Sequence, residues 1–212
     1  MRVIGFDLDM TIVDSSDAIV DGVAAVGRRW DVPIDEVWLR STIGLPLDVV
    51  FAELAPHVPY DEALEIYRAR YLTHGLVMHH VLPGAREALE TVVADGFEIL
   101  VVSAKKDTHV RAVLEHVGLD HLVAAVVGER FGDGKSEALR SARAEVYVGD
   151  HPGDVVGGRG AGALAVAVAT GPTTAEELAA AGADVVMDDL TTFVPWWRDW
   201  LDGAEAPAEE TA

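Results

Sequence analysis

The hydrophobic pattern of the chain consists of short apolar runs that alternate with segments of helical spacing. Most runs are nearly continuous, which is typical of strands buried on both faces of a parallel sheet. The runs are residues 3–6, 97–103, 122–128, 145–150, 163–171 and 184–187. Helical patterns separate the later runs, at 83–96, 107–118, 134–142 and 173–182. This alternation predicts an α/β fold, a Rossmann-like three-layer core with a parallel sheet between two layers of helices.

Residues 15–81 interrupt this rhythm. They contain no strong strand pattern, only apolar residues at helical spacing with prolines in the turns between them. We therefore expect a small helical domain inserted into a core made of residues 1–14 and 82–202. Residues 203–212 are acidic and rich in alanine, and are expected to form a frayed tail.

Composition restricts the partners of the protein. The 212 residues include 36 Asp and Glu against 16 Lys and Arg, a net charge of −20, which argues against nucleic acid and anionic membrane. The absence of cysteine excludes disulfides, thiol catalysis and thiolate metal sites. No apolar run reaches the roughly 18 residues of a membrane helix, and no signal-peptide pattern opens the chain. We expect a cytoplasmic protein, either monomer or homodimer.

Two acids, Asp7 and Asp9, follow the first apolar run, and their spacing in an extended chain directs both side chains to the same side. Like charges at the end of a buried strand repel each other and lose solvation. Other polar residues follow the other predicted strands: Ser103, Lys135, Asp150 and Asp154. Because the carboxyl ends of parallel strands meet at one edge of a sheet, we expect all of them to lie close together.

Such a set suits phosphoryl transfer. Several carboxylates around one point are tolerable if a divalent cation lies among them, and hard oxygen ligands favour Mg²⁺. Lys135 adds a fixed positive charge and Ser103 a hydroxyl donor. Phosphoryl transfer depends mainly on positioning and on neutralising charge, which these groups can provide.

Together, "DLDMTIVDS" at 7–15, Ser103 after its strand, Lys135, and "GDHPGD" at 149–154 resemble the four motifs of the haloacid dehalogenase superfamily. The insert resembles the helical cap of one subfamily, and the nearest group is phosphoglycolate phosphatase-like. The resemblance implies a Mg²⁺-dependent phosphomonoester hydrolase that acts on a small phosphorylated metabolite, with phosphoglycolate favoured.

The resemblance also implies roles for single residues. Asp7 is the expected nucleophile, which forms an aspartyl-phosphate, and Asp9 the acid and base. Ser103 and Lys135 are expected to hold the phosphoryl group. The implied metal ligands are Asp7, Asp9 through its backbone carbonyl, Asp150 and Asp154. The implied substrate-binding residues are Thr11, Arg40, Gly44, Ser103 and Ala104.

Some positions leave alternatives open. Met10 stands where the family commonly has Gly, and could touch the cap or the substrate. Lys105 or Lys106 could replace Lys135 in facing the phosphate. His151 is expected to have a structural role, because Mg²⁺ prefers oxygen. The adjacent histidines at 79–80 are expected to be exposed.

Residues 40–51 resemble the cap's specificity loop, with Gly44 and Pro46 in a turn. An arginine at the mouth of the site, Arg40, would favour a carboxylate or second anionic group on the substrate, although an exposed helix end is an equal alternative. A hexose-phosphate mutase would use the same core residues, and a non-catalytic phosphometabolite-binding protein is a further alternative. The absence of lysine from residues 15–81 excludes a Schiff-base mechanism in the cap.

Overall fold

The core of the protein is a six-stranded parallel sheet, seen in a computed structural model that describes residues 2–205. Its strands are β1 (Arg2–Phe6), β4 (Phe97–Val102), β5 (Val123–Val127), β6 (Ala144–Gly149), β7 (Leu164–Val168) and β8 (Val185–Met187). They lie in the order β5-β4-β1-β6-β7-β8, and each neighbouring pair is parallel. The six apolar runs of the sequence all form strands of this sheet, which confirms the predicted fold class.

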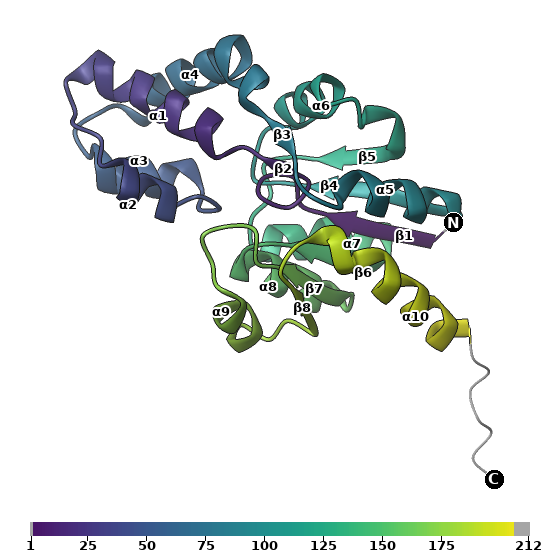
Figure 1. Cartoon of the computed structure of the whole chain (residues 1–212). Coiled ribbons are helices and arrows are strands. Elements are labelled where there is room, and N and C mark those ends of the chain that lie inside the picture. Colours follow the sequence, from purple (N-terminus) through teal and green to yellow (C-terminus); the bar gives the residue numbers. More distant parts are fainter. Residues whose placement is uncertain (1, 206–212) are drawn as a thin grey trace.

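Helices cover both faces of the sheet (Figure 1). They are α5 (Ala85–Ala94), α6 (Asp107–His116), α7 (Asp133–Ala142), α8 (Pro152–Ala161), α9 (Ala175–Ala180) and α10 (Phe193–Glu205). Within β4, Ile99 and Val101 pack in a cluster with Leu89 of α5, whereas Leu100 and Val102 pack with Leu139 of α7. Alternate residues of one strand thus face opposite helical layers, which explains why the strand sequences are continuously apolar.

The inserted residues form a separate group of helices beyond the carboxyl end of β1. In Figure 1 the arrowhead of β1 marks this end of the strand. The insert consists of α1 (Ser16–Trp30), α2 (Glu36–Ser41), α3 (Leu47–Leu54), α4 (Tyr60–Arg70), a π-turn at Tyr71–Gly75 and a short 3₁₀ turn at Leu76–Met78. Two short antiparallel strands, β2 (Val13–Asp14) and β3 (His80–Val81), join it to the core. The sequence pattern did not predict this pair. We propose that residues 15–81 form a cap on the core.

Two further elements differ from expectation. Helix α8 was not predicted, because its sequence, "PGDVVGGRGA", is rich in glycine and is typical of a loop. Helix α10 continues to Glu205, past the point where the tail was expected to begin at Gly203; residues 206–212 lie outside the described residues. Helix α10 packs on the core through Trp197, whose ring lies edge-on to that of Phe97 with the ring centres 4.8 Å apart. Over residues 2–205, no helix is long and apolar enough to cross a membrane.

Candidate active site

Three buried carboxylates meet at the carboxyl edge of the sheet. Asp7 follows β1, Asp150 follows β6, and Asp154 lies in the first turn of α8. Each side chain offers an oxygen, and these three oxygens lie within 4.8 Å of one another. The chain therefore brings together acids that are more than 140 residues apart in sequence, as the strand order predicted. We call these residues the acidic cluster.

A lysine from the second helical layer enters the acidic cluster. Nζ of Lys135, in the first turn of α7, lies 2.9 Å from Oδ1 of Asp7 and 2.6 Å from Oδ1 of Asp154. Burial raises the pKa of Asp7 to about 7, although the Lys135 charge opposes this change. One ammonium group thus offsets part of the charge of three acids, and the cluster keeps an excess of negative charge.

Tyr147 supports the cluster and was not identified from the sequence. Its hydroxyl lies 2.9 Å from the carbonyl oxygen of Val102 and 3.2 Å from Oδ1 of Asp154. Gly5 of β1, its neighbour in the sheet, leaves room for the ring, because a Cβ there would lie 2.7 Å from it. The signal available in the sequence was a tyrosine flanked by two valines in β6.

The acidic cluster fits a divalent cation. Oδ1 of Asp150 accepts a 3.0 Å hydrogen bond from the Thr11 hydroxyl, but its buried Oδ2 has no hydrogen-bond partner among the described residues. Burial, followed by the charges of Asp154 and Asp7, raises the pKa of Asp150. An unpartnered oxygen in a set of carboxylates is what a hard cation would satisfy, and all the available donors are oxygen.

Asp9 has a different environment from Asp7. It lies 3.3 Å from Nζ of Lys105, a side chain that is only 8% exposed and whose ammonium lies 4.0 Å above the ring of Tyr71. Oδ1 of Asp9 is buried and lacks a hydrogen-bond partner within residues 2–205. Of the alternative lysines, Lys135 therefore contacts Asp7 and Lys105 contacts Asp9.

Ser103 follows β4 and has a hydroxyl that is ready to donate. Its Oγ accepts a 3.1 Å hydrogen bond from the backbone N–H of Lys105, which leaves the hydroxyl proton free for another acceptor. The residue is buried, and with Ala104 it lines a cavity that also contains Asp7 and Asp9. Ser103 and Lys135 thus lie at the same cavity wall.

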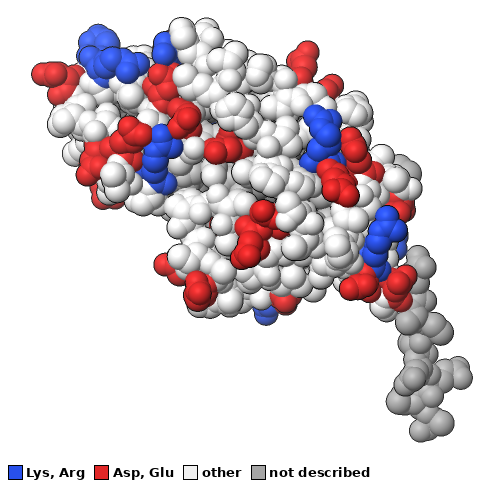
Figure 2. Space-filling view, in the orientation of Figure 1, with Lys and Arg blue, Asp and Glu red and all other residues white. Residues whose placement is uncertain are grey.

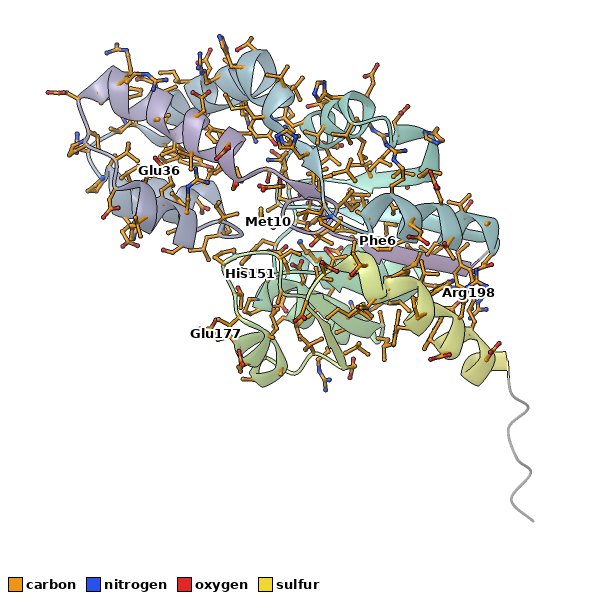
Figure 3. The ribbon with its side chains drawn as sticks, viewed as in Figure 1. Phe6, Met10, Glu36, His151, Glu177 and Arg198 are labelled. Atoms are coloured by element: carbon orange, nitrogen blue, oxygen red, sulfur yellow. The ribbon has the colours of Figure 1, made fainter. Side chains whose placement is uncertain are left out.

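This cavity has a volume of about 280 Å³ and lies between the cap and the carboxyl edge of the sheet. Gly44, in the turn between α2 and α3, lines it and packs closely on the core, since a Cβ there would lie 2.8 Å from the ring of His151. Figure 3 labels His151 and Met10 at this junction of cap and core. Gly44 and Ala104 thus both line the cavity, and their binding of substrate stays a prediction.

Of the two alternatives for Arg40, its position agrees with the exposed helix end, because it lies in the last turn of α2 and does not line the cavity defined by the described residues. Its guanidinium is held by two acids of the cap, at 2.7 Å from Asp17 and 2.8 Å from Glu36. Figure 3 shows Glu36 on the cap, away from His151, and Figure 2 shows basic groups lying among acids on this part of the surface. The cap arginine that lines the cavity is Arg68 instead.

Thr11 and Met10 support the loop that follows β1. Neither is among the described residues that line the cavity. Thr11 is buried and bonds to Asp150, so it positions a carboxylate. Met10 has a φ of 56°, a left-handed conformation that favours glycine, and its carbonyl oxygen accepts a hydrogen bond from the Thr170 hydroxyl. The backbone at this position explains why glycine is common there in similar motifs.

The histidines have structural roles. His151 caps α8 through Nδ1, which accepts a 2.9 Å hydrogen bond from the N–H of Gly153, and burial lowers its pKa. His79 is buried, with Nδ1 at 2.9 Å from the carbonyl oxygen of Gly75 and its other ring nitrogen bonded to the Tyr71 hydroxyl. The expectation of exposure is therefore wrong for His79, because the turn folds its ring inward; His80 is exposed.

Comparisons with known proteins agree with this geometry. Residues 4–168 match the family model described as haloacid dehalogenase-like hydrolase. A phosphoglycolate phosphatase from Vibrio cholerae is 26% identical, over 92% of this chain and 96% of its own length. One from Rhodospirillum rubrum is 28% identical, over 90% and 88%. A haloacid dehalogenase-like hydrolase from Streptococcus pneumoniae has a similar fold, with a TM-score of 0.83 at 22% identity over 93% of this chain and 98% of that one.

Proposed function

Because the chain belongs to the haloacid dehalogenase-like hydrolase family and is a phosphatase within it, we propose that it hydrolyses a small phosphomonoester through an aspartyl-phosphate on Asp7, with Mg²⁺ as cofactor. The observation that carries the proposal is that Asp7 and Asp9, which both follow β1, have different surroundings. Asp7 is held by Lys135 within the acidic cluster, whereas Asp9, which also lines the cavity, contacts Lys105 and has one oxygen without a hydrogen-bond partner among the described residues.

In the first step, a carboxylate oxygen of Asp7 attacks the phosphorus atom and the bond from phosphorus to the alcohol oxygen breaks. Asp9 donates its proton to the departing oxygen, which leaves as the alcohol. Lys135 neutralises charge on Asp7 and on the phosphoryl oxygens, and the free hydroxyl proton of Ser103 is donated to one of those oxygens.

In the second step, the aspartyl-phosphate is hydrolysed. Asp9, now a carboxylate, takes a proton from water as the water oxygen attacks phosphorus, and the bond from phosphorus to Asp7 breaks. Inorganic phosphate leaves, and both acids return to their initial states. The cap above the cavity keeps other water from the intermediate.

The cation site would consist of Asp7, Asp150 and the backbone carbonyl of Asp9. Asp154 would orient the site, because Lys135 and the N–H of His151 already occupy its two oxygens. A bound Mg²⁺ supplies positive charge to the phosphoryl oxygens and to the acidic cluster.

Phosphoglycolate is the ester that the names of the relatives suggest, and it is the reference substrate for the test. Phosphate release would be measured from a panel of esters, with Mg²⁺ and with a chelator, for the wild type and for Asp7→Asn. We expect release that requires both Mg²⁺ and Asp7. Retained release by Asp7→Asn, or equal release in chelator, would overturn the proposal. Interconversion of hexose phosphates without net release would indicate a mutase.

A further inference from the structure

The cavity has two chemically different walls. The wall formed by the core is polar and carries the acids together with Ser103 and Lys135. The wall formed by the cap is mostly apolar. Its members include Ile43, Leu45, Leu47, Leu64 and Tyr67. A phosphoryl group at Asp7 would therefore direct the rest of the substrate toward apolar side chains.

Part of this apolar wall is accessible to solvent. Leu45 and the partly buried Leu64 belong to none of the hydrophobic clusters formed by the described residues, whereas Leu47 packs against the main core and Ile43 is buried. Leu45 is 38% exposed although it lines a cavity. Large apolar side chains left in contact with solvent at a concave site gain stability when an apolar ligand covers them.

The positive charges of the cavity are concentrated on the opposite wall. Lys105 and Lys106 lie two and three residues after Ser103 in the same loop, and the backbone N–H of Arg130 donates a 3.0 Å hydrogen bond to the Ser103 carbonyl oxygen. These cations thus lie on the loops that would hold the phosphoryl group. Together with Lys135, they favour a dianionic phosphate there.

The cap offers little to a second anionic group. Within residues 15–81, Arg68 is the one basic side chain that lines the cavity, and its guanidinium is paired with Glu129 at 2.8 Å. The cap wall also carries an acid, Asp48. A carboxylate at the far end of the substrate would meet leucines, an acid and an arginine that already has a partner, and the remaining polar side chains there include the neutral tyrosines Tyr60 and Tyr67.

We propose that the leaving group of the substrate is an apolar alcohol, aliphatic or aromatic, and that Leu45 and Leu64 contact it. The cavity volume of about 280 Å³ lies near the lower end of the range for small-molecule sites, so the alcohol is small. This inference rests on the proposed phosphatase function and selects among its esters: phosphoglycolate is a poorer substrate than a phosphomonoester of the same shape whose leaving group is uncharged.

The test compares phosphoglycolate with isobutyl phosphate, in which an isopropyl group replaces the carboxylate at nearly the same volume. We expect kcat/KM of the wild type to be at least about tenfold higher for isobutyl phosphate. Leu64→Asn should lower kcat/KM for isobutyl phosphate by about tenfold and change that for phosphoglycolate by less than about twofold. Leu45→Asn, in an exposed turn where folding is not at risk, should act in the same direction.

The matched control is Leu72→Asn. Leu72 is also a leucine of the cap and is 39% exposed, but it is not among the described residues that line the cavity. It should leave both rates unchanged. A higher kcat/KM for phosphoglycolate, or equal losses of kcat/KM for both esters in Leu64→Asn and Leu45→Asn, would overturn the inference. In either case, Mg²⁺-dependent release of phosphate would still support the phosphatase function. No release from either ester or from para-nitrophenyl phosphate would overturn both.

Discussion

The ammonium group of Lys135 lies 2.9 Å from a carboxylate oxygen of Asp7, a residue 128 positions earlier in the chain. Both groups are buried, and the same ammonium reaches Asp154 at 2.6 Å. Among the described residues, this lysine is the one cation in direct contact with the acidic cluster. Its removal therefore affects both the stability of the fold and the chemistry at Asp7.

The first prediction concerns Lys135→Met. Breaking a buried ion pair leaves uncompensated charge, so the free energy of unfolding in chelator should fall by about 3 kcal/mol. Mg²⁺ should restore part of this loss, because a bound cation neutralises the same acids. The kcat should fall by about a hundredfold or more. Urea unfolding measures the change in stability, with Lys106→Met as its control, and phosphate release measures kcat. An equal loss of unfolding free energy with and without Mg²⁺ would contradict this prediction.

The second prediction concerns Asp9→Asn with para-nitrophenyl phosphate. Its leaving group needs no proton, so formation of the aspartyl-phosphate should continue, whereas hydrolysis should stall without a base. Rapid-mixing kinetics should show a burst of nitrophenol close to the enzyme concentration, followed by slow turnover. Asp7→Asn is the control and should show no burst. A linear time course in Asp9→Asn at the wild-type rate would exclude the role of Asp9.

The third prediction concerns Arg40, for which the sequence left a substrate-facing position and an exposed helix end as equal alternatives. Because Asp17 and Glu36 hold its guanidinium outside the cavity, Arg40→Ala should change kcat/KM for phosphoglycolate by less than about twofold. The free energy of unfolding should fall by less than about 1 kcal/mol, as is typical of exposed ion pairs. A selective rise in KM for anionic esters would show that Arg40 reaches the substrate.

The fourth prediction concerns the pH dependence of stability. Burial, and then the charge of Lys105, lower the pKa of His109 to about 4, against about 6.5 in an unfolded chain. Between pH 4 and pH 6.5, His109 binds a proton in the unfolded state but not in the folded state. Protonation therefore favours unfolding in this range, and the stability that the neutral His109 contributes above pH 6.5 is lost as the pH falls toward 4. The free energy of unfolding of His109→Gln, measured from pH 7 to 4, should therefore fall less than that of the wild type; parallel curves would contradict the pKa.

The sheet and the positions of the main acids could be predicted from sequence because each depends on local pattern. Continuous apolar runs define strands buried on two faces, and parallel order places their carboxyl ends together. The meeting of Asp7 and Asp150 at one edge of the sheet follows from these two rules, whereas the position of Asp154 depends also on helix α8.

The remaining features depend on contacts between distant residues. Helix α8 forms because Pro152 and the reciprocal hydrogen bonds between His151 and the first turn fix its start, and because glycines allow close packing: a Cβ on Gly157 would lie 2.9 Å from Lys135. The pairing of Arg40 with Asp17 depends on how α2 lies against α1. No local pattern in the sequence contains that information.

The most direct test of the account is identification of the phosphorylated residue. Asp9→Asn would be mixed with para-nitrophenyl phosphate and Mg²⁺, quenched in acid, digested, and analysed by peptide mass spectrometry. The account predicts phosphate on the peptide that contains Asp7, and none when the chelator replaces Mg²⁺ or when Asp7→Asn is added to the variant. Phosphate on another residue, or turnover by the wild type with no phosphate on Asp7 in the trapped variant, would contradict it.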